Sequence, residues 1–292
     1  RKDIWEKYKF DNYVTNIEDR IWAKKIINKK FNIVYQPDAN VFHYHGIHQN
    51  NNKDRLQNVV KIVSNSITTG SIDPNKTNIY AVLPIKGESL RISNTHLIEL
   101  TIKQLNSSKY IDKIVVTSDN KSTLKLAKKF NADIQILRPK KLSHPKVNLE
   151  QVQKYTLFEL EKKGHDIDLI IHCEETYPFR DKKIFDKMIE KILTEGLDTV
   201  IVSKNESNWL WSENKNSLQR IDSGDVPRKY KEKSMVGYHG IGCITYPEFI
   251  RKGKLLGDSI GLYQIENPLS FFEIRSKQSK SIASKILNSS TF

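Results

Sequence analysis

Few residues in this chain are of the kind that crosslink a protein or anchor it in a membrane. Its 292 residues include two cysteines, Cys173 and Cys243, which lie far apart and form no metal-ligand pair. A secreted domain held together by disulfides would carry more, so we expect reduced thiols. No apolar run approaches the length needed to cross a membrane, and no secretory signal opens the chain. The expectation is a soluble cytoplasmic protein without a membrane span.

The sequence also lacks a concentrated basic patch, although its net charge is +14 and its isoelectric point is near 9.5. Such a charge is compatible with binding to nucleic acid or to a membrane surface. The lysines are scattered through helical patterns such as 121–129 and 182–191, and no basic run is interleaved with stacking aromatic residues. Solvated helix faces explain this pattern, so no nucleic-acid partner is expected.

A stretch rich in turn-forming residues divides the chain. A length of 292 residues exceeds the usual size of one domain. Residues 68–76 are mostly Thr, Gly, Ser, Asp, Pro and Asn, and they are predicted to link residues 1–67 to a second domain at residues 77–292. The chain starts at Arg1 within sequence that already has a folded pattern, so we expect a fragment of a longer protein.

The first fifty residues predict a small α+β fragment. Thr15 and Glu18 have capping-box spacing, which predicts the start of a helix. Short strands are expected at residues 32–35 and 40–44. His43 and His45 alternate along the second strand and so would share one face. They are interpreted either as metal or substrate ligands or as ordinary, partly buried histidines.

This fragment resembles the C-terminal part of a family 2 glycosyltransferase, in which an acidic pair opens a helix and a YxPxAxVxHxHG-like segment follows. The matching residues are Glu18-Asp19 and residues 35–46. The resemblance implies that Asp19 is a catalytic general base, whereas a charge pair in the first turn of a helix is the alternative interpretation. The nucleotide-binding half of such an enzyme would precede Arg1, so we predict that this chain alone transfers no sugar.

The second domain alternates strand and helix signals. Strands are expected at residues 79–83, 113–117, 133–137, 169–172 and 199–202. Helices are expected at residues 95–106, 121–130, 148–163 and 181–193. This alternation predicts an α/β fold with a doubly wound, mostly parallel sheet, in which ligands bind at the carboxyl ends of the strands.

The loop after the first of these strands holds one glycine, Gly87, and two cations, Lys86 and Arg91. Backbone N–H groups ahead of a helix, with cations beside them, form a binding site for phosphate. An ordinary connection between strand and helix is the alternative interpretation.

Five segments in order resemble the acylneuraminate (CMP-sugar) cytidylyltransferases, which couple CTP to an acidic sugar and release pyrophosphate. The segments are residues 84–96, 115–119, 137–139, 174–180 and 239–244. The resemblance extends over about residues 77–292. It implies a Rossmann-like (GT-A-like) nucleotidyltransferase fold, with CTP and an acidic sugar as binding partners.

The resemblance also implies roles for individual residues. The predicted nucleotide-binding residues are Lys86, Gly87, Glu88, Ser89, Arg91, Ser118, Asp119 and Arg138. Lys86 and Arg91 are further expected to stabilise charge on the reacting phosphates. The predicted sugar-binding residues are Glu174, Thr176, Arg180, His239 and Gly240. Two alternatives remain open, because Arg180 would also serve as a surface cation at the start of a helix and Arg138 would also pair with a neighbouring acid.

The sequence departs from this family at the expected metal site. Two aspartates in a D-I-D element bind Mg²⁺ in the family, and Glu273-Ile274-Arg275 stands there in this chain. Glu273 is the remaining predicted metal ligand, since an arginine cannot bind a metal. Glu174 or Glu175 is the candidate replacement for the lost carboxylate. In the first loop, Leu90 occupies the position of a family lysine.

These observations lead to three hypotheses. The leading one is a cytidylyltransferase fused behind the tail of a glycosyltransferase, in surface polysaccharide biosynthesis. The second is a catalytically impaired scaffold that binds nucleotide or sugar, which Leu90 and Arg275 favour. The third is a chain that acts mainly as a glycosyltransferase. The family resemblance further implies that residues 207–233 reach into a second subunit, and hence a homodimer.

Overall fold

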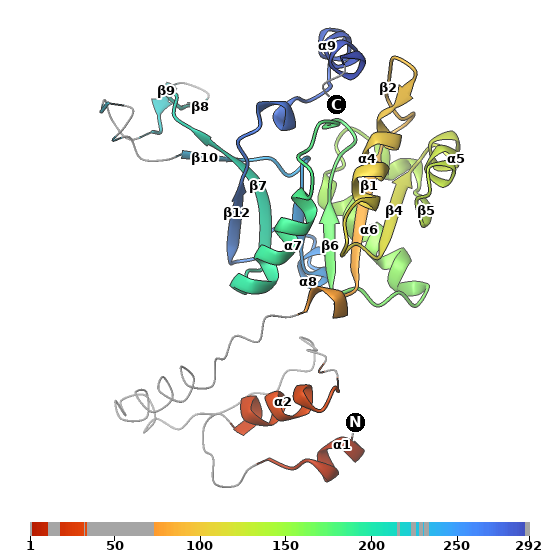
Figure 1. The fold of residues 1–292 in the computed structure, drawn as a ribbon, viewed down its shortest axis with the longest axis vertical. Coiled ribbons are helices and arrows are strands. Elements are labelled where there is room, and N and C mark those ends of the chain that lie inside the picture. The colour runs from red at the N-terminus through yellow and green to blue at the C-terminus, as the bar shows by residue number, and fades with distance from the viewer. Residues whose placement is uncertain are drawn as a thin grey trace. The chain divides into compact units, whose positions relative to one another are not determined.

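A computed structural model of the chain describes residues 2–10, 18–31, 33, 73–214, 217–222, 226–227, 230 and 234–289 (Figure 1). Contacts divide the chain into two compact units, Arg1–Gly70 and Ser71–Phe292. Among the described residues, no helix is both long and apolar enough to cross a bilayer.

The first unit contains the helices α1 (Lys2–Lys7) and α2 (Glu18–Asn28). The indole N–H of Trp22 donates a hydrogen bond to the carbonyl of Tyr8, and the ring centroids of Phe10 and Trp22 lie 5.5 Å apart. These contacts join α2 to the residues that follow α1. Helix α2 begins at the predicted acidic pair.

Several predictions for this unit fall outside the described residues. The strands expected at residues 32–35 and 40–44, with His43 and His45, lie there except for Ile33, which is in neither a helix nor a strand. Asp19 lies in the first turn of α2, but its side chain is also outside the description.

An eight-stranded sheet forms the centre of the second unit. Its strands are β1 (Ile79–Ile85), β4 (Lys113–Ser118), β5 (Ile134–Leu137), β6 (Leu169–His172), β7 (Thr199–Glu206), β10 (Ser234–Gly237), β11 (Cys243–Thr245) and β12 (Ile260–Gln264). The strands follow the order β5-β4-β1-β6-β11-β7, and β10 and β12 also pair with β7. Among the described strands of this sheet, the pairings of β10 with β7 and of β11 with β6 and β7 are antiparallel, and the others are parallel. The predicted mostly parallel sheet is confirmed.

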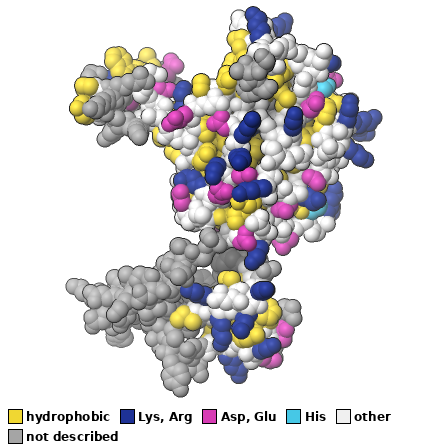
Figure 2. Space-filling view, viewed as in Figure 1, with side chains coloured by type: hydrophobic (Ala, Val, Ile, Leu, Met, Phe, Trp, Pro, Cys, Tyr) yellow, Lys and Arg dark blue, Asp and Glu magenta, His cyan; other side chains and the backbone are white. Residues whose placement is uncertain are grey.

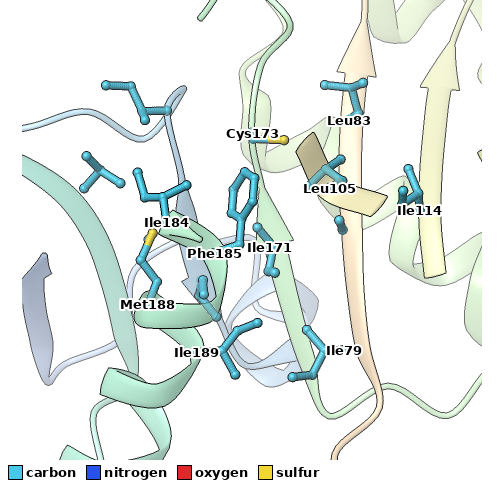
Figure 3. Close-up of a cluster of buried hydrophobic side chains, with 14 of the residues drawn as sticks. Ile79, Leu83, Leu105, Ile114, Ile171, Cys173, Ile184, Phe185, Met188 and Ile189 are labelled. Atoms are coloured by element: carbon cyan, nitrogen blue, oxygen red, sulfur yellow. The ribbon is translucent and has the colours of Figure 1, made fainter. Parts of the chain in front are cut away.

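Helices cover both faces of this sheet. They are α4 (Leu97–Asn106), α5 (Lys121–Lys129), α6 (Leu149–Lys162), α7 (Ile184–Glu195) and α8 (Pro247–Arg251). Alternate residues of β1 point to opposite faces, as the period of two in a strand requires. Ile79 and Leu83 pack with α4 and α7, and Figure 3 shows the α7 side chains Phe185 and Met188 directed into this cluster. Tyr80 and Val82 pack instead with residues of α6 and α8.

Two helices begin two or three residues later than predicted. The helix expected from residue 95 begins at Leu97, because Thr95–His96 forms β3 and pairs with β2 (Arg91–Ile92). The first loop therefore runs into a tight hairpin before α4. The helix expected from residue 181 begins at Ile184, since Lys183 has a left-handed φ of 61° and cannot continue a helix.

The sequence patterns did not predict the elements that follow β7. These include the hairpin β8 (Trp211–Asn214) and β9 (Ser217–Arg220), the 3₁₀ helix η5 (Pro268–Phe271) and α9 (Lys277–Asn288). The β8–β9 hairpin forms a sheet of its own, and it stands apart from the main sheet in Figure 1. Within the predicted linker, Pro74–Lys76 forms the short 3₁₀ helix η2.

Candidate functional site

The candidate site lies where the central parallel strands end. Strands β1, β4, β5 and β6 run in the same direction, so the segments after them gather at one edge of the sheet, called here the carboxyl edge. The first loop (residues 86–91, ending on the first residue of β2) follows β1, Asp119 follows β4, Arg138 follows β5, and residues 173–183 follow β6. These are the segments that carry most of the predicted binding residues.

Side chains from neighbouring strands hold the first loop in place. The N–H of Gly87 donates to Asp119 Oδ1 at 2.9 Å, and Thr123 Oγ1 donates to the carbonyl of Gly87 at 2.8 Å. Thr123 Oγ1 also accepts from the N–H of Ser89 at 3.2 Å. Gly87 has a φ of 68°, a conformation that glycine adopts without the steric cost of a Cβ atom.

A buried carboxyl group anchors the far end of the loop. Glu175 Oε2 accepts a hydrogen bond from Ser89 Oγ at 2.6 Å, and Glu175 Oε1 accepts one from the N–H of Leu90 at 2.9 Å. Burial raises the pKa of Glu175 to about 7, although both hydrogen bonds favour its charged form. Glu175 is therefore occupied in positioning the loop, a role that the sequence patterns did not reveal.

The cations of this region face solvent. Lys86 and Arg91 are exposed, as is the acidic residue Glu88 between them. Arg91 Nη2 donates to Asn94 Oδ1 at 3.4 Å. The N–H groups of Gly87 and Ser89 already donate to Asp119 and Thr123. Phosphate contacts from this loop would thus come from the Lys86 and Arg91 side chains more than from the backbone.

Arg138 and Asp119 form the second part of the predicted nucleotide site. Arg138 is buried, its Nη1 donates to the carbonyl of Thr117 at 2.7 Å, and its Nη2 lies 3.9 Å from Asp119 Oδ1. Burial alone would raise the pKa of Asp119, but the N–H of Gly87 and the Arg138 guanidinium outweigh it and lower that pKa. Ser118 is buried, and its Oγ accepts from the N–H of Asn120 at 3.1 Å. Arg138 thus pairs with a neighbouring acid, Asp119, which is the alternative that the sequence offered to direct nucleotide binding.

Arg180 is buried, with 5% of its surface exposed to solvent, whereas a surface cation at the start of a helix would be mostly exposed. Its guanidinium donates to the backbone carbonyls of Tyr177, Glu174, Gly240 and Ile241 and to the side chain of Gln104. These contacts use all the donors that an arginine has. The surface interpretation is wrong, and contact with a sugar would require some of these bonds to break.

Two histidines flank Glu174 at the carboxyl edge. Glu174 Oε1 lies 3.4 Å from His239 Nε2 and 3.9 Å from His172 Nε2, while Thr176 Oγ1 donates to Glu174 Oε2 at 3.3 Å. Burial would raise the pKa of Glu174, but the two histidines outweigh it and hold that pKa well below its usual range. His172, Glu174 and His239, called here the His–Glu cluster, are close enough together to hold a metal ion.

The predicted metal ligand Glu273 lies beside Tyr177 and Arg275. Arg275 Nε donates to Glu273 Oε1 at 2.5 Å. Burial, with the hydrogen bond and negative charge of Glu273, raises the pKa of the Tyr177 hydroxyl. Gly240 fits closely against Tyr177 and Glu174, because a Cβ atom added to it would lie 2.6 Å from a ring carbon of Tyr177. The predicted sugar-binding residues therefore pack as one group.

The fold and the site at its carboxyl edge define a Rossmann-like domain of the nucleotidyltransferase type. A family model described as Cytidylyltransferase matches residues 89–284, which is more than half of the chain. The chain belongs to the cytidylyltransferase family. No curated protein matches it significantly.

Solved structures show the same fold. A 4-diphosphocytidyl-2C-methyl-D-erythritol synthase from Anaerococcus prevotii DSM 20548 has a TM-score of 0.53 at 14% identity, covering 72% of this chain and 96% of that one. CMP:2-keto-3-deoxy-manno-octonic acid synthetase, solved with CTP, has a TM-score of 0.52 at 10% identity, covering 72% and 98%. A further 4-diphosphocytidyl-2C-methyl-D-erythritol synthase has a TM-score of 0.51 at 11% identity, covering 73% and 100%.

Proposed function

We propose that the chain is a CTP-dependent nucleotidyltransferase of the acylneuraminate cytidylyltransferase type, acting on an acidic sugar in surface polysaccharide biosynthesis. The observation that carries the proposal is the first loop. Asp119, Thr123 and Glu175 fix its backbone, and it presents Lys86 and Arg91 to solvent at the carboxyl edge, in a chain of the cytidylyltransferase family.

The proposed reaction is an in-line displacement at the α-phosphorus of CTP. A sugar hydroxyl oxygen forms a bond to this phosphorus and loses its proton to solvent water. The bond from this phosphorus to the oxygen that bridges the α- and β-phosphates breaks, and pyrophosphate leaves with that electron pair. Negative charge grows on the phosphate oxygens during this step, so fixed cations lower its barrier. Lys86 and Arg91 supply such cations, and Asp119 keeps the loop between them in position.

The sugar is proposed to bind at Glu174, Thr176, His239 and Gly240. His239 is half-exposed, and its Nε2 lies 3.4 Å from Glu174 Oε1, so its imidazole faces the region where the sugar is proposed to bind. Arg180 holds the backbone of this region in place through its hydrogen bonds to the carbonyls of Glu174 and Gly240. It therefore acts as a positioning residue in this proposal.

The residues near Glu273 fit a protein-bound Mg²⁺ poorly. This ion takes oxygen ligands in octahedral geometry, usually including one or two carboxylates. Glu273 already accepts from Arg275, and Glu174 is flanked by imidazoles. These residues allow a different arrangement, in which the triphosphate of CTP would carry the Mg²⁺ ion and Glu273 would be its single protein ligand. We assign no catalytic step to it.

One observation favours the scaffold as a second candidate function. The Arg275–Glu273 ion pair places a cation where the resembled family has a metal-binding acid. A scaffold would bind CTP without releasing pyrophosphate, whereas an enzyme would bind CTP and release pyrophosphate from it.

The glycosyltransferase origin of residues 1–67 remains a further proposal, which is supported by the position of Asp19 in the first turn of α2.

Replacing Lys86 or Arg91 by alanine is predicted to weaken CTP binding by about 10–150-fold. A charge-assisted phosphate contact contributes about 1.5–3 kcal/mol, which corresponds to this range. Isothermal titration calorimetry measures the change. Lys113→Ala is the matched control, because Lys113 begins β4 at the opposite edge of the sheet and lies 3.4 Å from Asp133 Oδ1. Equal CTP affinity in all four proteins would show that the first loop is not the nucleotide site.

The β8–β9 hairpin supports the proposed homodimer. Trp211 pairs with Arg220 and Leu218 pairs with Glu213, so these four side chains share one face of the hairpin. Trp211 is 54% exposed and Leu218 is 67% exposed. Exposed apolar groups on one face are typical of a protein interface.

The double variant Trp211→Ser, Leu218→Ser is expected to weaken dimerisation at least tenfold, because it removes the apolar anchors of this face. Sedimentation velocity over a range of concentrations measures the shift. Gln219→Ser, on the opposite face of β9, should leave the dimer unchanged. A wild-type chain that stays monomeric at every concentration would contradict the proposal.

A further inference from the structure

We propose that the His–Glu cluster is a binding site for a divalent transition-metal ion of the zinc class, distinct from the Mg²⁺ predicted at Glu273. His172 ends β6, Glu174 lies in the loop after it, and His239 lies in the connection between β10 and β11. The site therefore joins two parts of the chain that are remote in sequence.

The spacing of the three side chains is close to that of metal ligands. Ligand atoms at 2.0–2.2 Å from a tetrahedral Zn²⁺ lie about 3.4 Å from one another. His239 Nε2 and Glu174 Oε1 are already 3.4 Å apart, and the distance from His172 Nε2 to Glu174 Oε1 is 3.9 Å. All three ligand atoms lie within 4.8 Å of one another. Small side-chain movements are enough to complete the geometry.

The backbone fixes the two loops that carry these ligands. The N–H of Glu174 donates to the carbonyl of Gly240 at 2.8 Å, which holds the two connections together next to His239. Arg180 Nη2 donates to the carbonyls of the same two residues. The ligands therefore sit on a braced framework, as a preorganised site requires.

A buried, unpartnered nitrogen points to a ligand at this place. His172 is 1% exposed, and its Nε2 is without a hydrogen-bond partner among the described residues. An imidazole nitrogen left without a partner in the interior is costly, and metal binding would remove that cost. The rings of His172 and His239 are nearly parallel, with centroids 5.8 Å apart. Glu174 lies within reach of both.

Gln153 provides the second contact that a metal-binding histidine usually has. The side-chain amide of Gln153 lies 2.8 Å from His172 Nδ1, and its Oε1 is also unpartnered in the described part of the chain. Amide oxygen and nitrogen exchange places by rotation. With the oxygen facing Nδ1, this nitrogen carries the ring proton and Nε2 presents its lone pair toward Glu174 and His239.

The donor set selects the class of metal. Two imidazoles and one carboxylate suit Zn²⁺, Co²⁺ or Ni²⁺, whereas Mg²⁺ prefers oxygen ligands alone. Three protein ligands leave one position open, and the half-exposed His239 side chain gives access to it from solvent. An oxygen of the sugar or of a phosphate is the expected occupant of this position. That last assignment rests on the proposed function, whereas metal binding itself does not.

The test uses the full, untagged chain after treatment with a chelator and dialysis. Co²⁺ titration followed by visible absorption should show one ion per chain in a low-symmetry site, and Zn²⁺ should displace it. His239→Ala and Glu174→Gln are expected to lower the Co²⁺ affinity at least tenfold. Gln153→Leu should lower it by about 10–100-fold, as loss of a supporting contact does. His144→Ala, which changes an exposed histidine in another loop, should leave it unchanged.

Circular dichroism of each variant verifies that the fold is intact, and the half-exposed His239 makes its variant the least disruptive. Failure of the wild type to bind Co²⁺ or Zn²⁺ would overturn the proposal. So would a folded His239→Ala variant with wild-type affinity. Because this measurement needs no nucleotide, a chain that binds the metal without using CTP would refute the proposed function alone.

Discussion

The Arg180→Lys variant is expected to lose about 3–5 kcal/mol of unfolding free energy. Arginine fills five hydrogen-bond acceptors at this position, four of them backbone carbonyls. Lysine has three donors and no planar fork, so it leaves carbonyls unpaired in the interior. Each buried unpaired group costs about 1–3 kcal/mol, and these costs are not fully additive.

Urea denaturation followed by circular dichroism measures this loss. Arg251→Lys is the matched control, because Arg251 is half-exposed and pairs with Glu161 on the surface. It should cost less than about 1 kcal/mol. If Arg180→Lys were as stable as the wild type but failed to bind the sugar, Arg180 would be a substrate ligand instead of a structural residue.

Gly240→Ala is expected to reduce catalytic turnover about 100-fold or more. The new Cβ would lie 2.6 Å from a ring carbon of Tyr177 and 3.1 Å from the carboxyl carbon of Glu174. A Cβ contact of 2.6 Å does not occur in real structures and one of 3.1 Å is unusually tight, so Tyr177 must move and Glu174 must give slightly, and such overpacking costs about 1–3 kcal/mol. Displacement of about 1 Å at reacting groups can cost about two orders of magnitude in rate.

Pyrophosphate release and thermal melting together test this expectation. Gly237→Ala is the control, because its Cβ would meet only the Ile201 side chain, at a distance of 3.4 Å or more. This variant should keep wild-type turnover. Wild-type turnover in Gly240→Ala as well would mean that Tyr177 and Glu174 are not held against substrate.

The fold of the second unit is predictable where local patterns are strong. The expected strand at residues 169–172 coincides with β6, and the expected helix at residues 148–163 differs from α6 by one residue at each end. β12 cannot be predicted from its own sequence for a physical reason, because it is half-exposed and gains its place by parallel pairing with β7, some sixty residues earlier. The sequence did carry a signal for α9, since Ile282, Ala283, Ile286 and Leu287 recur at helical spacing, although only Ala283 among them is fully buried.

The site shows the same division between local and remote information. Residues such as Lys86 and Asp119 are found from the sequence because they follow apolar strands. The role of Glu175 is hidden, since the Ser89 hydroxyl that it binds is 86 residues away in the sequence. Burial also separates Arg180 from Arg91, although each lies in the connection between a strand of the main sheet and the helix that follows it. The sequence did hold one signal for the role of His172, because it is a histidine at the end of an apolar strand, two residues before Glu174.

The central claim is that this chain transfers the cytidylyl group of CTP to an acidic sugar. The most direct measurement supplies CTP radiolabelled at its α-phosphorus, divalent metal and a panel of eight- and nine-carbon acidic sugars, and separates the products. We predict that the label appears in a CMP-sugar and that unlabelled pyrophosphate forms in equal amount. Retention of all label in CTP with every sugar, by a folded chain that binds CTP, would contradict the claim and identify a scaffold.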